Sequence, residues 1–204
     1  MEQQFQYYAF ISYKREDEKW AKWLQDRLRW YKLPSKLCRQ ITRLPKKVWP
    51  VFRDNTDLDS GRLEENIRHE LERSHYLIVI CSPEAARSPW VGKEVKYFAT
   101  LHGADKIIPF VVSGIPYSND IETECIHEQI KAISQEELLA INVREEGIGS
   151  FAMKKKRAFI RVVARLLDIK FNTLWQPYER ILRIRKWSTG IGVVFILIRF
   201  IHLV

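Results

Sequence analysis

The sequence predicts an α/β protein built on a five-stranded, mainly parallel sheet with the doubly wound arrangement of flavodoxin-like folds. Short apolar runs alternate along the chain with stretches in which apolar residues recur every three or four positions, as in strands followed by amphipathic helices. The clearest run, Tyr76–Cys81, is continuously apolar, as expected where helices cover both faces of a parallel sheet. Because such sheets bind ligands at the carboxyl ends of their strands, we expect functional residues there.

The first third of the chain contains two predicted strands and one clear helix. The first strand is predicted at Tyr7–Ser12. A helix over Glu16–Trp30 follows it, because large apolar side chains recur there at helical spacing: Trp20, Trp23, Leu24 and Leu28. The next stretch, Leu33–Lys47, is basic and interrupted by prolines, which predicts either a loop or a broken helix. A short second strand is expected at Val48–Phe52.

The middle of the chain is predicted to hold the third strand and the helix that follows it. A polar loop, Arg53–Gly61, and a helix over Leu63–Arg73 lead to the strand at Tyr76–Cys81. Two Ser-Pro pairs follow, at Ser82 and Ser88, and each is a good N-cap with proline at the first helical position. The second pair begins a helix that runs to about Leu101 and turns three residues towards the core: Val91, Val95 and Phe98.

The last two strands are expected at Lys106–Val112 and Leu138–Val143. A closing helix over Met153–Leu167 has four inward-facing residues: Phe159, Val162, Val163 and Leu166. These elements predict one domain over residues 1–170. A basic juxtamembrane helix or linker is expected at 171–187, and a membrane-associated or transmembrane helix at 188–204.

The net charge of +9 belongs to the C-terminal part of the chain. Between Lys154 and Lys186 there are 11 Lys and Arg against two acids, whereas residues 1–153 carry 22 basic and 23 acidic side chains. The body of the protein is therefore close to neutral. A polyanion-binding face across the whole domain is not expected, and we predict no nucleic-acid partner.

The C-terminal segment has the pattern of a membrane anchor. Every residue of Ile191–Ile198 is apolar, and Ser188–Val204 has 17 residues, the short limit for a spanning helix. The basic Arg180–Trp187 precedes it, which would keep the domain in the cytoplasm at the inner membrane. Three cysteines without C-x-x-C spacing also suit a reducing cytoplasm. The alternative is a helix packed on the domain or on a partner.

Three segments together resemble the three sequence boxes of TIR (Toll/interleukin-1 receptor) domains. They are Tyr8–Tyr13 with the charged Lys14–Asp17, Val51–Asp54 with the loop to Gly61, and Leu77–Ser82 with Ser88–Val95. The second box resembles the family's BB loop. Their order, their spacing and their places at predicted strand ends make the chain similar to bacterial TIR proteins from about Tyr7 to Asp168, so the resemblance implies a TIR fold.

Within that family, members that cleave NAD+ carry a glutamate four residues after a tryptophan in the third box. Trp90 and Glu94 fit this spacing, which is close to one helical turn and places both side chains on one face of their helix. The resemblance therefore implies an NAD+ nucleosidase with Glu94 as its catalytic carboxylate. NAD+ would be the substrate, and no cofactor is expected.

Eight further residues in the three boxes are candidates for binding the substrate: Phe10, Ser12, Lys14, Arg15, Arg53, Asp54, Ser82 and Trp90. The two aromatic rings could wall the nicotinamide and ribose. Ser12, Lys14, Arg15 and Ser82 sit where polar and basic groups could meet the ribose and pyrophosphate. Arg53 and Asp54 would shape the BB-like loop.

These residues also have ordinary structural explanations. A glutamate in the second turn of a helix is most often a solvated surface residue. Phe10 could belong to the core, Arg53 and Asp54 could form a local ion pair, and Lys14 with Arg15 could be a solvated turn. Cys81, which ends a buried strand, is expected to be a small core hydrophobe.

Other classes of site lack their motifs in this sequence. The pairs His69–Glu70 and His127–Glu128 have no second histidine at metal spacing, so we expect no metal site. No P-loop is present, and no G-x-G-x-x-G follows a predicted strand. Any dinucleotide would therefore be bound differently from the cofactor of a Rossmann dehydrogenase.

The resemblance also implies a biological setting, that of Thoeris-like bacterial defence against phage. Such domains deplete NAD+ or produce an ADP-ribose-derived signal for an effector protein, and the resemblance leaves cyclase or base-exchange activity open. They act as homo-oligomers through TIR–TIR contacts, so we expect weak activity from a dilute monomer. The alternative is a non-catalytic TIR module that only assembles. A basic surface binder would rest on the 154–186 cluster alone, where the sequence offers no evident stacking platform.

Overall fold

A computed structural model describes residues 5–41, 44–45, 47–53, 61–133, 139–144 and 149–176. Within these residues, five parallel strands form one sheet in the order β2-β1-β3-β4-β5. The strands are β1 (Tyr7–Ser12), β2 (Val51–Arg53), β3 (Ser74–Cys81), β4 (Ile107–Val111) and β5 (Ile141–Asn142). This order reverses direction at β1 and β3, which confirms the predicted doubly wound sheet and its switch point.

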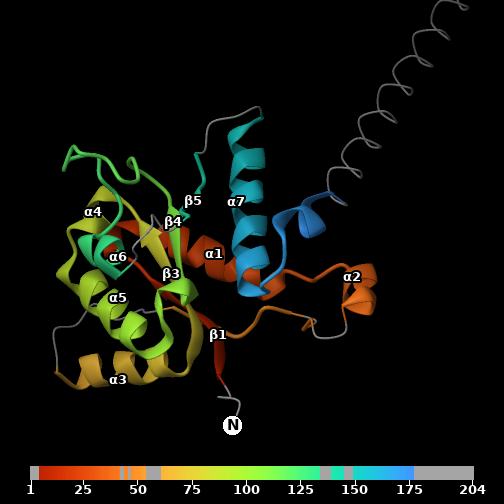
Figure 1. The fold of residues 1–204 in the computed structure, drawn as a ribbon, viewed down its shortest axis with the longest axis horizontal. Helices are drawn as coiled ribbons and strands as arrows, with labels where there is room; N and C mark the ends of the chain where they lie inside the picture. Colours follow the sequence, from red (N-terminus) through yellow and green to blue (C-terminus); the bar gives the residue numbers. More distant parts are fainter. Residues whose placement is uncertain are drawn as a thin grey trace, which may run out of the picture.

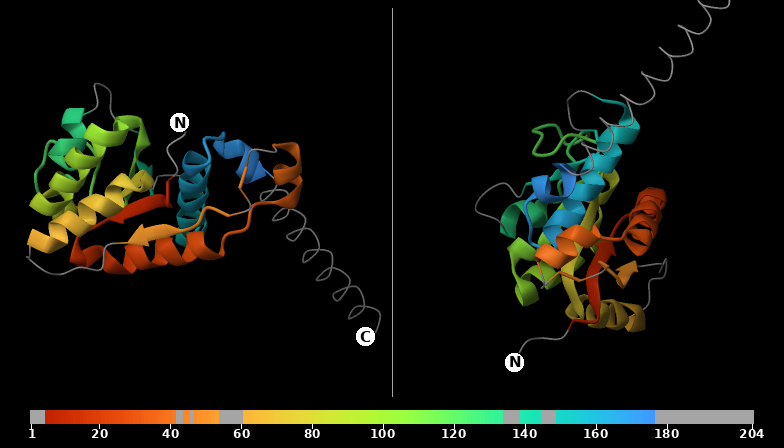
Figure 2. Two further views of the ribbon diagram at one scale, coloured as in Figure 1. Left: turned by 90° about the horizontal axis from the view of Figure 1, so that it is seen from below. Right: turned by 90° about the vertical axis from the view of Figure 1, so that its right-hand side faces the viewer.

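Helices cover both faces of the sheet. They are α1 (Glu18–Trp30), α2 (Ser35–Gln40), α3 (Gly61–Glu72), α4 (Pro83–Ala86), α5 (Pro89–His102), α6 (Glu128–Ile133) and α7 (Phe151–Leu166). Short 3-10 turns, η1 (Arg15–Asp17) and η2 (Ala104–Lys106), precede α1 and β4. Figure 1 shows α3, α5 and α6 together on one side, with α7 on the other, and Figure 2 shows the same layers from two further directions.

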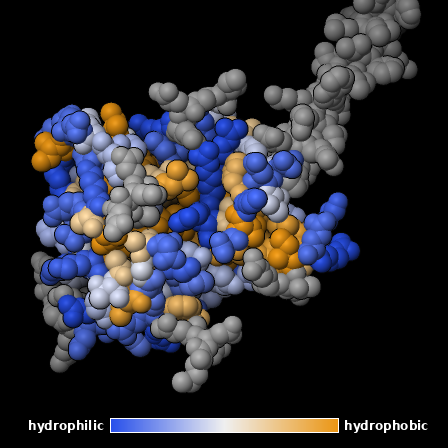
Figure 3. Space-filling model, in the orientation of Figure 1, coloured by the Kyte–Doolittle hydropathy of each residue, from blue (hydrophilic) through white to orange (hydrophobic). Residues whose placement is uncertain are grey.

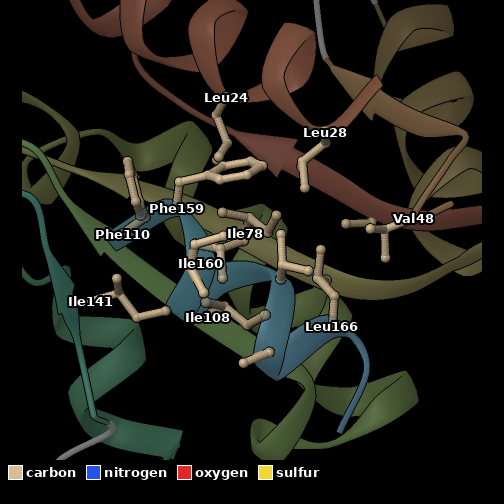
Figure 4. Close-up of a cluster of buried hydrophobic side chains, with 14 of the residues drawn as sticks. Leu24, Leu28, Val48, Ile78, Ile108, Phe110, Ile141, Phe159, Ile160 and Leu166 are labelled. Atoms are coloured by element: carbon tan, nitrogen blue, oxygen red, sulfur yellow. The ribbon is translucent and has the colours of Figure 1, made fainter. Parts of the chain in front are cut away.

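Successive strand residues point to opposite faces and so divide the core in two. Ile78 and Ile80 of β3 belong to a cluster with α1 and α7, whereas Leu77 and Val79 belong to a cluster with α3, α5 and α6. In the first cluster, Leu24 and Leu28 of α1 point towards side chains of α7 and the central strands (Figure 4). The core residues predicted for α5 and α7 are all buried: Val91, Val95, Phe98, Phe159, Val162, Val163 and Leu166.

Several element boundaries differ from the prediction. The basic stretch Leu33–Lys47 contains the short helix α2, so the broken helix is the correct alternative. The second strand is shorter and later than predicted, because the backbone pairs with β1 only from Val51 to Arg53. The third helix begins at Gly61, two residues earlier. The sequence analysis did not predict α6, whose six residues are too few to show a helical repeat.

The surface around α7 has both hydrophilic and hydrophobic parts. On the face in Figure 3, hydrophilic residues gather over α7, with hydrophobic residues beside them on the side of α2. Among the described residues, no helix combines the length and the apolar character needed to cross a bilayer. Residues 171–176 are helical. Most of the predicted juxtamembrane segment, 171–187, and all of the predicted anchor, 188–204, lie outside the described residues and stay predictions.

Candidate functional site

The N-terminal end of α5 begins as the Ser-Pro pair predicts. The Ser88 side chain accepts a hydrogen bond from the Val91 backbone N–H at 3.4 Å, and Pro89 occupies the first turn. Val91 and Val95 then pack into the core against the sheet. This packing fixes the rotation of the helix, so that Glu94, one turn after Trp90, points to the sheet rather than to solvent.

Glu94 is a buried carboxylate at the carboxyl end of β1. Its side chain is 4% exposed, so the ordinary explanation of a solvated surface glutamate is wrong. Ser12, the last residue of β1, is fully buried and donates its hydroxyl proton to Glu94 Oε2. An ionised carboxylate is costly to bury unless hydrogen bonds compensate it, so this contact stabilises Glu94 at the switch point of the sheet.

Glu94 and Trp90 share a pocket between α3 and α5, the α3–α5 pocket, with a volume of about 310 Å³. Its lining includes Ile67, Arg68, Leu71, Trp90, Glu94 and Tyr97. Cations lie over both of its aromatic rings: Lys93 Nζ is 5.4 Å from the Trp90 centroid, and Arg68 Cζ is 5.3 Å from the Tyr97 centroid. The pocket thus combines apolar side chains, two aromatic rings, nearby cations and one carboxylate. Such a lining is suited to an anionic ligand that also carries flat rings.

A second serine–carboxylate pair lies at the end of β3. Ser82 caps α4 by accepting a hydrogen bond from the Ala85 backbone N–H at 3.1 Å, and its hydroxyl donates to Asp17 Oδ2. Burial raises the pKa of Asp17, an effect that the Ser82 hydrogen bond partly offsets and the nearby Glu84 reinforces. Sequence reasoning placed Ser82 correctly at a helix start but missed its partner, because Asp17 lies 65 positions away.

The remaining predicted residues lie in different surroundings. Phe10 is fully buried in the core and stacks on Phe52, with ring centroids 5.2 Å apart. Lys14 is half-buried before the η1 turn, and Arg15 in that turn is exposed. Asp54 lies outside the described residues, as does most of the BB-like loop. The structure therefore brings Glu94, Trp90 and Ser12 together, and Phe10 is not among the residues that line the α3–α5 pocket.

Arg53 joins the end of β2 to α1. Its Nη1 donates to the Tyr13 hydroxyl at 2.9 Å and to Glu18 Oε1 at 3.3 Å, and its Nε donates to Gln25 Oε1 at 3.2 Å. The guanidinium also lies 5.7 Å from the Tyr13 ring centroid. These contacts hold the chain where the BB-like loop begins, so Arg53 anchors the base of that loop against α1.

A close contact between α5 and the segment before α6 was not predicted. A Cβ atom at Gly92 would lie 2.5 Å from Cε1 of His127, closer than packed atoms tolerate. The His127 ring donates from Nε2 to the Ser88 carbonyl at 3.1 Å and accepts the Gln129 N–H at Nδ1 at 3.0 Å. Burial lowers the pKa of His127, which favours the neutral ring that this pattern requires. Gly92 thus lets His127 hold the helix that carries Glu94.

Comparison with known proteins identifies related sequences and folds. The sequence model described as "TIR domain" matches residues 9–146. A protein from Actinoplanes sp. named "NAD(+) hydrolase ApTIR" is 36% identical over 110 residues, which are 53% of this chain and 14% of that protein. The chain therefore matches only a small part of this relative. The TIR domains of the activated Roq1 resistosome align with a TM-score of 0.49 and 14% identity, covering 76% of this chain and 98% of theirs.

Proposed function

Because this chain belongs to the TIR domain family, whose model spans residues 9–146, we propose that it cleaves the nicotinamide–ribose bond of NAD+ with Glu94 as its catalytic carboxylate. The observation that carries the proposal is the position of Glu94, buried at the switch point of the sheet, bonded to Ser12 and lining the α3–α5 pocket with Trp90. The name of the Actinoplanes relative supports the same activity here.

The chemistry requires little more than a well-placed anion. The bond between the nicotinamide nitrogen and the ribose anomeric carbon breaks, both electrons leave with nicotinamide, and the leaving group departs neutral because it was a cation in NAD+. Positive charge develops on the ribose, as in glycoside hydrolysis, and a fixed carboxylate stabilises it. Water then adds to the anomeric carbon and releases a proton, which gives ADP-ribose.

Residues of the α3–α5 pocket have complementary roles in this proposal. Glu94 faces the ribose, and Ser12 positions the carboxylate through its hydrogen bond. The Trp90 and Tyr97 rings stack on the planar groups, and Arg68 and Lys93 neutralise the pyrophosphate. Lys14 and Arg15 at the end of β1 add positive charge nearby. We also propose Ser82 and Asp54 as substrate-binding residues, as the sequence predicts, and Arg53 holds the chain where the BB-like loop begins.

The proposal also covers the biological role, the reaction products and the assembly of the protein. We propose a role in bacterial defence, in which NAD+ falls or an ADP-ribose-derived signal reaches an effector protein. A cyclic product would form if an internal nucleophile reached the anomeric carbon before water, and a base-exchange product if a second base did. Assembly through TIR–TIR contacts, and tethering to the membrane by residues 188–204, belong to the same proposal.

A second candidate function is a non-catalytic TIR module that only assembles. The observation that favours it is the segment after β4, where two isoleucines are exposed: Ile115 at 57% and Ile121 at 73%. Contiguous exposed apolar surface marks protein contacts, and a partner that covered both side chains would form such a surface. The two functions differ in one measurable way, since an assembly module releases no nicotinamide.

Nicotinamide release from NAD+ by concentrated protein tests the proposal. We compare wild type with Glu94→Gln, which keeps the size of the side chain and an acceptor for Ser12 but removes the charge. Release is expected to fall at least about 100-fold, the cost typical of losing one preorganised electrostatic group. Glu128→Gln, an exposed glutamate at the start of α6, is the matched control and should retain wild-type activity.

Two results would reject the catalytic proposal. One is absence of nicotinamide release from assembled wild-type protein, which favours the assembly module. The other is equal release by wild type and Glu94→Gln, which would place the catalytic group elsewhere. Thermal unfolding of both proteins serves as the check that the substitution preserves the fold.

A further inference from the structure

A second cleft lies between α1 and α7, on the face of the sheet opposite the α3–α5 pocket. We call it the α1–α7 cleft; it has a volume of about 640 Å³, and its lining includes Trp23, Arg27, Trp30, Tyr31, Lys155 and Lys156. Its volume falls in the range of small-molecule sites. Nothing in the proposed cleavage of NAD+ uses these residues.

The charged side chains that line the α1–α7 cleft are all basic. Its described lining residues include four cations, Arg27, Lys32, Lys155 and Lys156, and no acid. Lys155 Nζ lies 4.1 Å from the Trp23 ring centroid and 4.3 Å from the Trp20 centroid, a position that removes part of its hydration. Burial, and then repulsion from Arg27, lower the pKa of Lys155. An anion in the cleft would relieve this repulsion.

Most of the aromatic lining of the cleft comes from α1 and the residue after it. Trp30 is 73% exposed, although tryptophan is normally well buried. Trp23 and Tyr31 belong to the same lining, and α7 adds Phe159, which is buried. The sequence shows no evident stacking platform within the basic cluster of α7, and the fold places the exposed Trp30 of α1 beside that cluster. An exposed indole at the mouth of a basic cleft is suited to stacking on a flat ring.

We propose that the α1–α7 cleft is a second, non-catalytic binding site for a nucleotide. The phosphates would contact Lys155, Lys156 and Arg27, and the base would stack on Trp30. One cleft of this size suits a mononucleotide better than a nucleic-acid strand, which needs a continuous basic band, and residues 1–153 are close to neutral. The proposal is independent of Glu94, since it requires no cleavage.

Isothermal titration calorimetry of the full chain with ADP tests the proposal, because ADP has phosphates and a base but no nicotinamide. Lys155→Gln should weaken ADP binding about tenfold by removing a charged hydrogen-bond donor. Trp30→Ala should weaken it about tenfold by removing the stacking surface, and Trp30→Phe should restore most of the affinity. Because Trp30 is largely exposed, its substitution leaves the core intact.

Matched controls locate the binding. Lys22→Gln removes the same charge from an exposed position of α1 that does not line the cleft, and it should bind ADP as wild type does. Arg68→Ala removes a cation of the α3–α5 pocket, so ADP binding that persists in this variant and is weakened by Lys155→Gln belongs to the α1–α7 cleft. If Arg68→Ala abolishes binding and the cleft variants do not, ADP occupies the other pocket and the proposal is wrong.

Three further titrations test the class of ligand. Inorganic pyrophosphate should bind more weakly than ADP, and equal affinities would show that the rings take no part. The other two probes are a single-stranded oligonucleotide and vesicles of anionic phospholipid. If either binds more tightly than ADP and is equally sensitive to Lys155→Gln, the ligand is a polyanion or a membrane surface, and the nucleotide proposal is wrong. Absence of any ADP binding by wild type would also overturn the proposal.

Discussion

The two faces of the sheet are built for different tasks. The face covered by α1 and α7 has the larger cluster of buried apolar side chains. The face covered by α3, α5 and α6 has a smaller core, and buried polar groups surround α5: Ser88, Glu94, Glu124 and His127. Apolar burial contributes stability in proportion to area, whereas buried polar groups need specific partners. The first face therefore supplies most of the stability, and the second holds the candidate catalytic carboxylate in one position.

The largest effect on stability is expected from the apolar face. Phe110 of β4 is fully buried there among side chains of α1 and α7. Phe110→Ala should destabilise the protein by about 3–5 kcal/mol, because it removes a large apolar side chain and leaves a cavity. Chemical denaturation measures the loss, and Leu101→Ala, at a position 45% exposed, is the control with an expected change near zero. NAD+ cleavage by the fraction that stays folded should be unchanged. A loss of activity without a loss of stability would contradict the assignment of stability to one face and of catalysis to the other.

Local patterns predicted the first strand and the start of α5 correctly. The strand Tyr7–Ser12 has the predicted bounds because its apolar run is short and sharply bounded. Trp90 and Glu94 share a pocket because helical geometry relates positions four apart, which spacing alone reveals. The contact of Gly92 with His127 and the bond of Ser82 to Asp17 join distant parts of the chain. No local pattern encodes such pairs, since they depend on which helices become neighbours across the sheet.

An intermediate effect is expected at the contact that holds α5. Gly92→Ala places a Cβ atom 2.5 Å from the His127 ring, so the ring or the helix must shift. Overpacking of this kind costs about 1–3 kcal/mol, and it should also lower NAD+ cleavage because Glu94 lies on the same helix. Thermal unfolding and nicotinamide release measure the two effects.

The double variant Gly92→Ala with His127→Ala distinguishes overpacking from other causes. Removal of the ring makes space for the new methyl group, so the double variant should be more stable than the sum of the two single effects predicts. Strictly additive effects would mean that the Gly92–His127 contact does not hold α5, and the proposed link between this contact and the catalytic carboxylate would fail.

The smallest effect is expected from Asp17, the second buried carboxylate. Its pKa is raised in the folded protein, so the folded state holds the proton more tightly than the unfolded state does. The free energy of unfolding should therefore fall as pH rises from the ordinary aspartate pKa through the raised one. Above both pKa values, the charged carboxylate destabilises the folded protein by its full amount. Asp17→Asn keeps an acceptor for Ser82 and removes the charge. Its unfolding midpoint at pH 7 should exceed that of wild type by about 2–4 °C at most, and the difference should vanish in acid. A difference that is the same at every pH would show that the buried charge of Asp17 does not limit stability.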